Sequence, residues 1–257
     1  MDDLLECVEA VTEQELENVL TETRAQFELD AGVSDAALGW PARVAAGMDR
    51  LVESARLDGL AYYYRGRGEL ERLGAALILG GSRLTGRGVP CAGEGDLKNA
   101  VAMLLMDRLG AGGSFTEFYA MDMNEGFVLM GHDGPGHVAI SDRRPILRGL
   151  GLYHGKAGSG ISVEFRVKTG PVTILGLTQT ADGRLKLLAA EGETIPGEIL
   201  RIGNTNSRVR FALPPDQFID RWCAEGPTHH VALGIGRQAA VLRKVGQLLG
   251  LETVVVC

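Results

Sequence analysis

Four side chains of types that bind divalent cations are candidates for chemistry: Glu94, Glu117, His132 and His230. The first three lie within residues 91–137, where Glu94 precedes a predicted helix, Glu117 lies on a predicted strand and His132 ends the next strand. Two carboxylates and two imidazoles form a mixed oxygen and nitrogen ligand set, which suits Mn²⁺ or a similar ion better than a structural zinc. We therefore predict that all four residues converge on one cation.

Glu94 lies in the sequence Gly93-Glu94-Gly95-Asp96, whose glycines leave room for a ligand to approach the backbone. A helix that starts near Asp96 would place its positive end beside the Glu94 carboxylate. The alternative is that Glu94 and Asp96 are ordinary acids at a helix N-terminus. Local spacing does not separate the two interpretations.

Glu117 is flanked by aromatic residues, and strand alternation places it on the same face as Phe115 and Tyr119. An unpaired carboxylate is costly to bury, which favours a cation partner, although a solvated strand face explains the same pattern. His132 ends an apolar run and precedes a glycine-rich loop, a placement that is typical of functional residues. A structural role remains the default interpretation for any lone histidine.

His229 and His230 are adjacent, so in an extended strand their side chains point to opposite faces. Only one of them can then easily face a given metal ion. The sequence contains no Ser-His-Asp elbow, no P-loop and no complete GxGxxG fingerprint that would compete for the chemistry.

Hydrophobic periodicity predicts two helices near the N-terminus, at 12–27 and 34–55, with Thr12 and Ser34 as their N-caps. The elements predicted next are a short buried strand (60–64), a loop (65–68) and a helix (69–79). This succession of helices and strand indicates a layered α/β region.

From Gly110 onward the hydrophobic period changes to the alternation that is typical of strands. Strands are predicted at 161–168, 172–177 and 184–190, and tight turns at 124–126 and 182–183. Short strands joined by tight turns favour an antiparallel barrel or sandwich. The tail returns to the α/β pattern with a helix (216–223), a strand (230–235), a helix (237–249) and a last strand (252–256).

Composition limits the possible partners. The net charge is −7, and the longest basic cluster, Arg143-Arg144 followed by Arg148, is too short for a nucleic-acid surface, so we expect no nucleic-acid partner. No apolar run approaches the roughly 20 residues that cross a bilayer. The sequence shows no secretory leader, and its four cysteines form no CxxC pair. These features predict a soluble cytoplasmic protein without a membrane partner.

The chain resembles L-arabinose isomerase and its L-fucose isomerase-like relatives in the order and spacing of four motifs: AGEGDLK (92–98), GSFTEFY (113–119), GH (131–132) and HH (229–230). The resemblance implies a Rossmann-like α/β region over 1–110, followed by a C-terminal domain over 111–257 that contains an antiparallel β-barrel. By position it implies Glu94, Glu117, His132 and His230 as the Mn²⁺ ligands, with His230 preferred because the family's ligand directly precedes a small or β-branched residue.

The resemblance also implies an activity: aldose–ketose isomerisation of a monosaccharide by metal-assisted ene-diol proton transfer between C1 and C2, with Glu94 and Glu117 as the catalytic acids and bases. A homo-oligomer with shared active sites is implied as well. The family has a further N-terminal α/β domain that this chain lacks, so we expect a fragment or a reduced member. The alternative is a truncated domain that binds sugar or metal without turnover.

Overall fold

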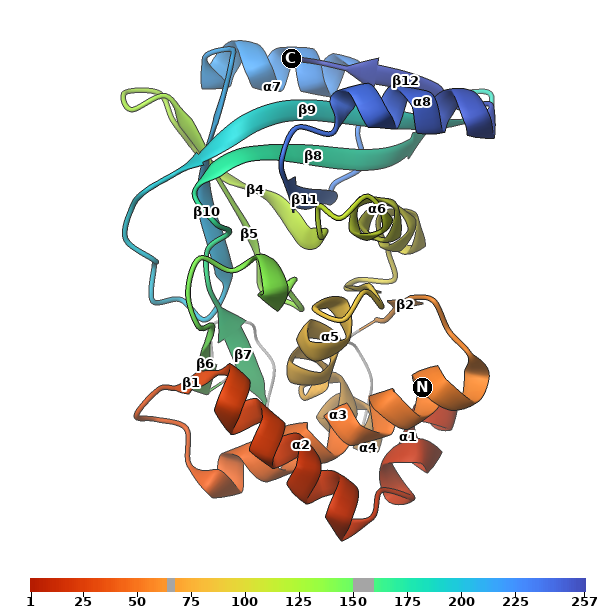
Figure 1. Cartoon of the computed structure of the whole chain (residues 1–257), viewed down its shortest axis with the longest axis vertical. Coiled ribbons are helices and arrows are strands. Elements are labelled where there is room, and N and C mark those ends of the chain that lie inside the picture. Colours follow the sequence, from red (N-terminus) through yellow and green to blue (C-terminus); the bar gives the residue numbers. More distant parts are fainter. Residues whose placement is uncertain (64–67, 150–159) are drawn as a thin grey trace.

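The computed structural model describes residues 1–63, 68–149 and 160–257, so most of the loop predicted at 65–68 lies outside the described residues. The helices of the N-terminal part gather at one end of the molecule, and the β-barrel occupies the other end together with the C-terminal helices (Figure 1). The helices are α1 (Asp2–Glu9), α2 (Glu13–Gln26), α3 (Asp35–Ala55), α4 (Glu69–Gly74), α5 (Leu77–Thr85), α6 (Leu97–Arg108), the 3-10 helix η1 (Val138–Ile140), α7 (Pro215–Ala224) and α8 (Ala239–Leu249). Within the described part of the chain, no helix has the length and apolar character needed to span a membrane.

Six antiparallel strands close into the barrel. They are β4 (Ser114–Asp122), β5 (Phe127–His132), β8 (Gly170–Gln179), β9 (Leu185–Ile195), β10 (Thr205–Phe211) and β11 (Val231–Ile235). Their order is β10-β5-β4-β11-β8-β9, and the pairing of β9 with β10 closes the ring. The tail strand β12 (Glu252–Val255) adds to β9 in the parallel direction. The predicted antiparallel barrel is confirmed.

Both predicted hairpin turns connect barrel strands. In the β4–β5 turn, the Asp122 carboxylate accepts hydrogen bonds from the N–H groups of Asn124 (3.0 Å) and Glu125 (2.8 Å). Gly126 in this turn and Gly183 in the β8–β9 turn have φ values of 70° and 87°. Glycine accepts such positive φ values without steric cost, which is why these sequences form tight turns.

The middle of strand β8 is buried on both faces. On β8, Val172 and Ile174 pack in the core that fills the barrel, whereas Leu175 and Leu177 belong to a second core. The second core also contains Met103 of α6, which packs across β8 and β11. This packing holds α6, and the loop that precedes it, against the outer wall of the barrel.

The N-terminal helices follow the predicted caps. The Thr12 hydroxyl accepts a hydrogen bond from the Glu15 N–H (3.3 Å), and the Glu15 carboxylate accepts one from the Thr12 N–H (2.7 Å), which forms the predicted capping box of α2. Ser34 caps α3 through its hydroxyl alone, which accepts a hydrogen bond from the Ala37 N–H (3.2 Å). The segment predicted as a helix at 69–79 is helical but is divided into α4 and α5 just after Gly74, a residue type that disfavours helix. Helix α1 was not predicted.

Two small sheets lie outside the barrel. One pairs β2 (Leu60–Ala61) with β3 (Cys91–Ala92) in parallel, and the other has the order β1 (Glu28–Leu29), β6 (Ile146–Gly149), β7 (Ile161–Glu164). The strand predicted at 161–168 is therefore shorter and lies outside the barrel, because it pairs with β6. Since β1 also pairs with β6, the regions 1–110 and 111–257 share a sheet, and the boundary between them stays a prediction.

Candidate metal centre

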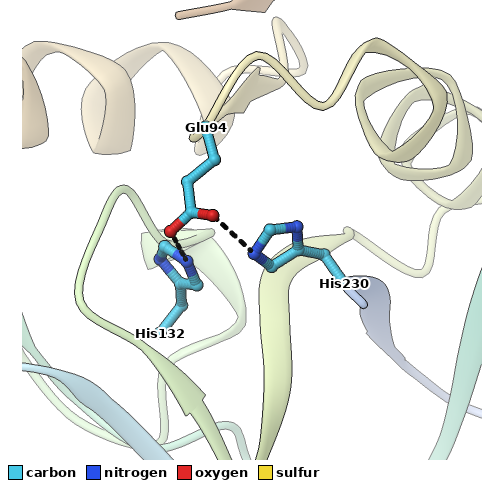
Figure 2. Close-up of side chains that lie close together, drawn as sticks. All are labelled: Glu94, His132 and His230. Carbon is cyan, nitrogen blue, oxygen red and sulfur yellow. Dashed lines mark ion pairs between the residues drawn. The ribbon is translucent and has the colours of Figure 1, made fainter. Parts of the chain in front are cut away.

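Three of the four predicted ligands lie together (Figure 2). Glu94 extends from the loop between β3 and α6, His132 is the last residue of β5, and His230 directly precedes β11. The Glu94 Oε1 atom lies 3.9 Å from His132 Nε2, and Glu94 Oε2 lies 3.8 Å from His230 Nε2. One carboxylate therefore faces two imidazoles, from segments that are distant in the sequence.

The backbone of the Glu94 loop is unusual. Glu94 has a φ of 57°, in the left-handed region that non-glycine residues rarely occupy and that is frequent at functional sites. A hydrogen bond of 2.7 Å from the Gly95 N–H to the Tyr62 carbonyl fixes the position of this loop. A Cβ atom at Gly93 would lie 3.1 Å from Phe115 Cε1. The space beside this glycine, which we predicted would admit a ligand, is therefore filled by the Phe115 ring.

His230 is oriented by Asp96. The His230 Nδ1 atom lies 3.0 Å from Asp96 Oδ2, while Asp96 Oδ1 accepts the Asn99 N–H (2.9 Å) and so caps α6. Burial acts to raise the pKa of Asp96, but the hydrogen bonds from His230 and Asn99 hold that pKa below its ordinary value. The other ring nitrogen, His230 Nε2, is buried and has no hydrogen-bond partner among the described residues. No sequence signal links Asp96 to His230, and this orienting role was missed.

Phe115 supports both histidines. Its side chain is fully buried, and its ring centroid lies 4.3 Å from the ring centroids of both His132 and His230. The backbone N–H of His132 donates a 2.9 Å hydrogen bond to the Thr205 hydroxyl, which joins the end of β5 to β10. Asp133 places a carboxylate oxygen 3.6 Å from His132 Nδ1. The positions of both rings are thus set by packing and by the barrel register.

Glu117 adjoins this group but pairs with a different histidine. Its Oε2 atom lies 2.6 Å from His229 Nε2, and ligand atoms of Glu117, His229 and His230 lie within 4.8 Å of one another. Burial raises the pKa of Glu117, although His229 and His230 act in the opposite direction. Strand alternation does not apply to the two histidines, because β11 begins only at Val231. The four predicted residues thus belong to two overlapping groups that share His230, and the contact of Glu117 with His229 was not predicted.

The donor set fits a divalent cation. Two atoms bound to one ion at about 2.0–2.2 Å can lie no more than about 4.4 Å apart, and the separations of 3.8 and 3.9 Å around Glu94 meet this limit. Because His230 directs Nδ1 at a carboxylate, its Nε2 presents a lone pair, as in metal-binding histidines that are held by a carboxylate. A buried lone pair without a partner is costly, and a metal ion would satisfy it.

A pocket of about 610 Å³ opens beside these residues, within the usual size range for small-molecule sites. Glu117 lines it, as does Asp133, the residue next to His132. The remaining wall includes Tyr119, Leu200, Ile202 and Asn204. A ligand in this pocket would therefore contact the acids beside the candidate metal ligands.

Comparison with known proteins shows the family of this chain. The model of the L-arabinose isomerase C-terminal domain matches residues 112–252, more than half of the chain. The chain belongs to this family. The match includes Glu117, His132 and His230, and it confirms the resemblance found in the sequence motifs.

The curated relatives reported below are named as sugar isomerases. The sulfoquinovose isomerase of Priestia aryabhattai is 26% identical over 183 residues, which cover 70% of this chain and 40% of the relative. The L-arabinose isomerase of Herpetosiphon aurantiacus is 26% identical over 263 residues, covering 97% of this chain and 52% of the relative. That of Shouchella clausii is 22% identical over 260 residues, covering 99% and 53%. The chain thus spans about half the length of the curated relatives that it matches.

Proposed function

We propose that this chain forms the metal-binding part of an aldose–ketose isomerase. The observation that carries the proposal is the position of Glu94 between His132 and His230, beside a pocket that Glu117 lines. Membership of the L-arabinose isomerase C-terminal domain family supports it, as do relatives that are named sugar isomerases. The substrate is a monosaccharide. The protein is a homo-oligomer, as the family resemblance implies, and it is cytoplasmic, as the composition predicts.

In this proposal Glu94, Glu117, His132 and His230 bind Mn²⁺ or a similar divalent ion. Such an ion, when bound, supplies a Lewis acid that polarises sugar oxygens on neighbouring carbons. The two histidines chiefly hold the ion, and Asp96 keeps the His230 ring in the orientation that directs Nε2 towards Glu94. Phe115 excludes water from the space behind both rings, because it is fully buried against them.

The proton transfers are assigned to the two carboxylates. Conversion of an aldose to a ketose through an ene-diol removes the proton from C2, delivers a proton to C1 and moves one proton between the oxygens on these carbons. Glu94 and Glu117 divide these tasks between them. Their placement suits this, because Glu94 lies within the histidine group whereas Glu117 lines the pocket.

The direct test replaces each acid by its amide, as Glu94→Gln and Glu117→Gln, and follows ketose formation from a panel of aldoses with Mn²⁺ present. We expect turnover to fall by about 10²–10⁴-fold, the usual contribution of positioned proton transfer. Glu125→Gln is the matched control, because Glu125 is an exposed acid in the β4–β5 turn. Turnover by Glu94→Gln or Glu117→Gln within about twofold of the parent would reject the assigned roles.

A second candidate function is binding of metal and sugar without turnover. It is favoured by the pocket and by the group of Glu94, His132 and His230, which offer binding sites whether or not proton transfer follows. Under this alternative, Mn²⁺ raises the unfolding temperature and calorimetry detects sugar binding, but no aldose in the panel yields ketose. An unfolding temperature that neither Mn²⁺ nor a chelator changes would reject both functions, because a ligand that binds only the folded state must stabilise it.

A further inference from the structure

One wall of the pocket beside the candidate metal centre comes from outside the strands of the barrel. Leu200, Ile202 and Asn204 line the pocket from residues 196–204, the connection between β9 and β10. Figure 1 shows this connection leaving the barrel and running towards β6 and β7. It contains no helix or strand, so regular backbone pairing does not fix its position. Other contacts must hold this part of the pocket, which we call the 200–204 wall.

Glu164 of β7 supplies one of these contacts. Its side chain is 1% exposed, and its Oε2 atom accepts a 3.0 Å hydrogen bond from the N–H of Gly203, which lies between Ile202 and Asn204. Gly203 has a φ of 75°, and a Cβ atom there would lie 2.6 Å from Ser162 Oγ, so the wall passes closely against β7. A buried carboxylate thus joins the 200–204 wall to a strand that lies outside the barrel.

Arg148 of β6 holds the Glu164 carboxylate in place. The Nε atom of Arg148 lies 2.9 Å from Glu164 Oε2 and its Nη2 atom lies 2.8 Å from Oε1, while its Nη1 atom donates to Asp30 Oδ1 at 2.6 Å. A guanidinium that binds both oxygens of a carboxylate fixes the relative orientation of the two planar groups. The Glu164 carboxylate is therefore held with one oxygen directed at Gly203.

The ion pair is not needed to hold β6 and β7 together. The two strands pair along their full length, and Leu147 and Val163 belong to the largest hydrophobic core. Buried ion pairs generally add little stability compared with apolar residues of similar volume. Apolar residues in place of Arg148 and Glu164 would therefore keep the strands and remove the contact with Gly203.

A second anchor acts on the wall from the barrel. Asn206 of β10 accepts the Leu200 N–H (2.9 Å) and donates to the carbonyls of Leu200 (3.2 Å) and Asn204 (3.0 Å). Asn206 thus holds both ends of the wall, whereas Glu164 holds the part next to Ile202. Loss of the Glu164 contact would free this part of the wall and leave its ends in place.

We propose that Glu164, held by Arg148, is a positioning residue for the pocket: it keeps the 200–204 wall where a bound monosaccharide contacts it. This inference rests on the proposed function, which assigns the pocket to a sugar. Glu164 neither lines the pocket nor belongs to the candidate metal groups found among the described residues, so it acts through Gly203. Sugar affinity should therefore depend on Glu164, whereas Mn²⁺ affinity and the rate of the chemical step should not.

The test combines Arg148→Met with Glu164→Leu in the whole chain, which leaves no unpaired charge in the buried position. Calorimetry measures binding of Mn²⁺, and then binding of L-arabinitol and D-glucitol, which cannot isomerise, to the Mn²⁺-loaded chain. Ketose formation from a panel of aldoses gives KM and kcat. We expect the alditol Kd and the KM to rise by about 10-fold, because loss of a hydrogen bond to a charged group releases the wall. The Mn²⁺ Kd and kcat stay within about twofold of the parent.

Asp49→Asn is the matched control. Asp49 of α3 lies away from the pocket and pairs at 3.3 Å with Arg83, whose side chain is 3% exposed, so the variant weakens a comparable ion pair and keeps the alditol affinity. If the combined variant unfolds at a lower temperature than the parent in chelator, Glu164→Gln replaces it. Its neutral oxygen accepts a weaker hydrogen bond, so the expected rise in alditol Kd is about threefold.

Two results in the folded variant overturn the inference: an alditol Kd equal to that of the parent, or a loss of Mn²⁺ affinity as large as the loss of alditol affinity. A parent that binds neither alditol overturns it as well. If no aldose yields ketose but the variant weakens alditol binding alone, the isomerase assignment fails and the positioning role of Glu164 stands. If ketose forms and the variant leaves KM and alditol binding unchanged, the positioning role alone fails.

Discussion

Asp96 offers a sharp test of the candidate metal centre, because one carboxylate performs two separable tasks. Its Oδ1 caps α6, and its Oδ2 holds His230 Nδ1 at 3.0 Å. Serine is also a good N-cap residue, but its side chain is too short to reach His230. Asp96→Ser therefore removes the contact with His230 and keeps the cap, whereas Asp96→Ala removes both.

The expected magnitudes follow from these two contacts. Loss of the cap in Asp96→Ala lowers the free energy of unfolding by about 1 kcal/mol, or about 2–4 °C in unfolding temperature for a chain of this size. Loss of a partner that orients a metal-binding histidine weakens metal affinity by about 10–100-fold. At an Mn²⁺ concentration of 100 times the parent Kd, stabilisation by the ion then falls from about 2.7 kcal/mol to between about 0.4 and 1.4 kcal/mol.

The assay combines calorimetric titration with Mn²⁺ and thermal unfolding with and without the ion. In chelator, Asp96→Ser unfolds close to the parent and Asp96→Ala unfolds several degrees lower. In Mn²⁺, both variants lose about half or more of the gain in unfolding temperature that the parent shows. If Asp96→Ser binds Mn²⁺ with the affinity of the parent, Asp96 does not orient a metal ligand and the argument from His230 is refuted.

Three further predictions concern packing and charge. Phe115→Ala removes a fully buried ring that contacts both histidines, so we expect a loss of about 3–5 kcal/mol in the free energy of unfolding, measured in urea, and weaker Mn²⁺ binding by calorimetry. Gly131→Ala would place a Cβ atom 1.8 Å from the Thr205 carbonyl oxygen, so β5 and β10 must separate and the unfolding temperature should fall by more than that of any surface glycine variant. The capping box lowers the pKa of Glu15 from 4.5 to about 2, so its contribution to stability is complete above pH 4.5 and is lost as the pH falls towards 2. The stability difference between the parent and Glu15→Gln should therefore shrink over that interval and stay constant above it, and a difference that is independent of pH would contradict the assignment.

Features that depend on neighbouring residues were predictable. The capping box of α2 needs only Thr12 and Glu15, three residues apart, and the hairpin turns need only a glycine that accepts a positive φ. The division of 69–79 into two helices was missed, because a local pattern does not show how each half packs. The strand at 161–164 was grouped with the barrel strands, because alternation reports burial on one face and does not identify the pairing partner.

For this chain, the sequence by itself determined the residue types of the candidate site, the positions of Glu94, His132 and His230 at element ends, and the family resemblance. Only the tertiary structure decided that Asp96 holds His230 and that Glu117 pairs with His229. The physical reason is separation along the chain. These contacts require β11 to pair with β4, which lies far earlier in the sequence, and α6 to pack against β11, and no local pattern records either event.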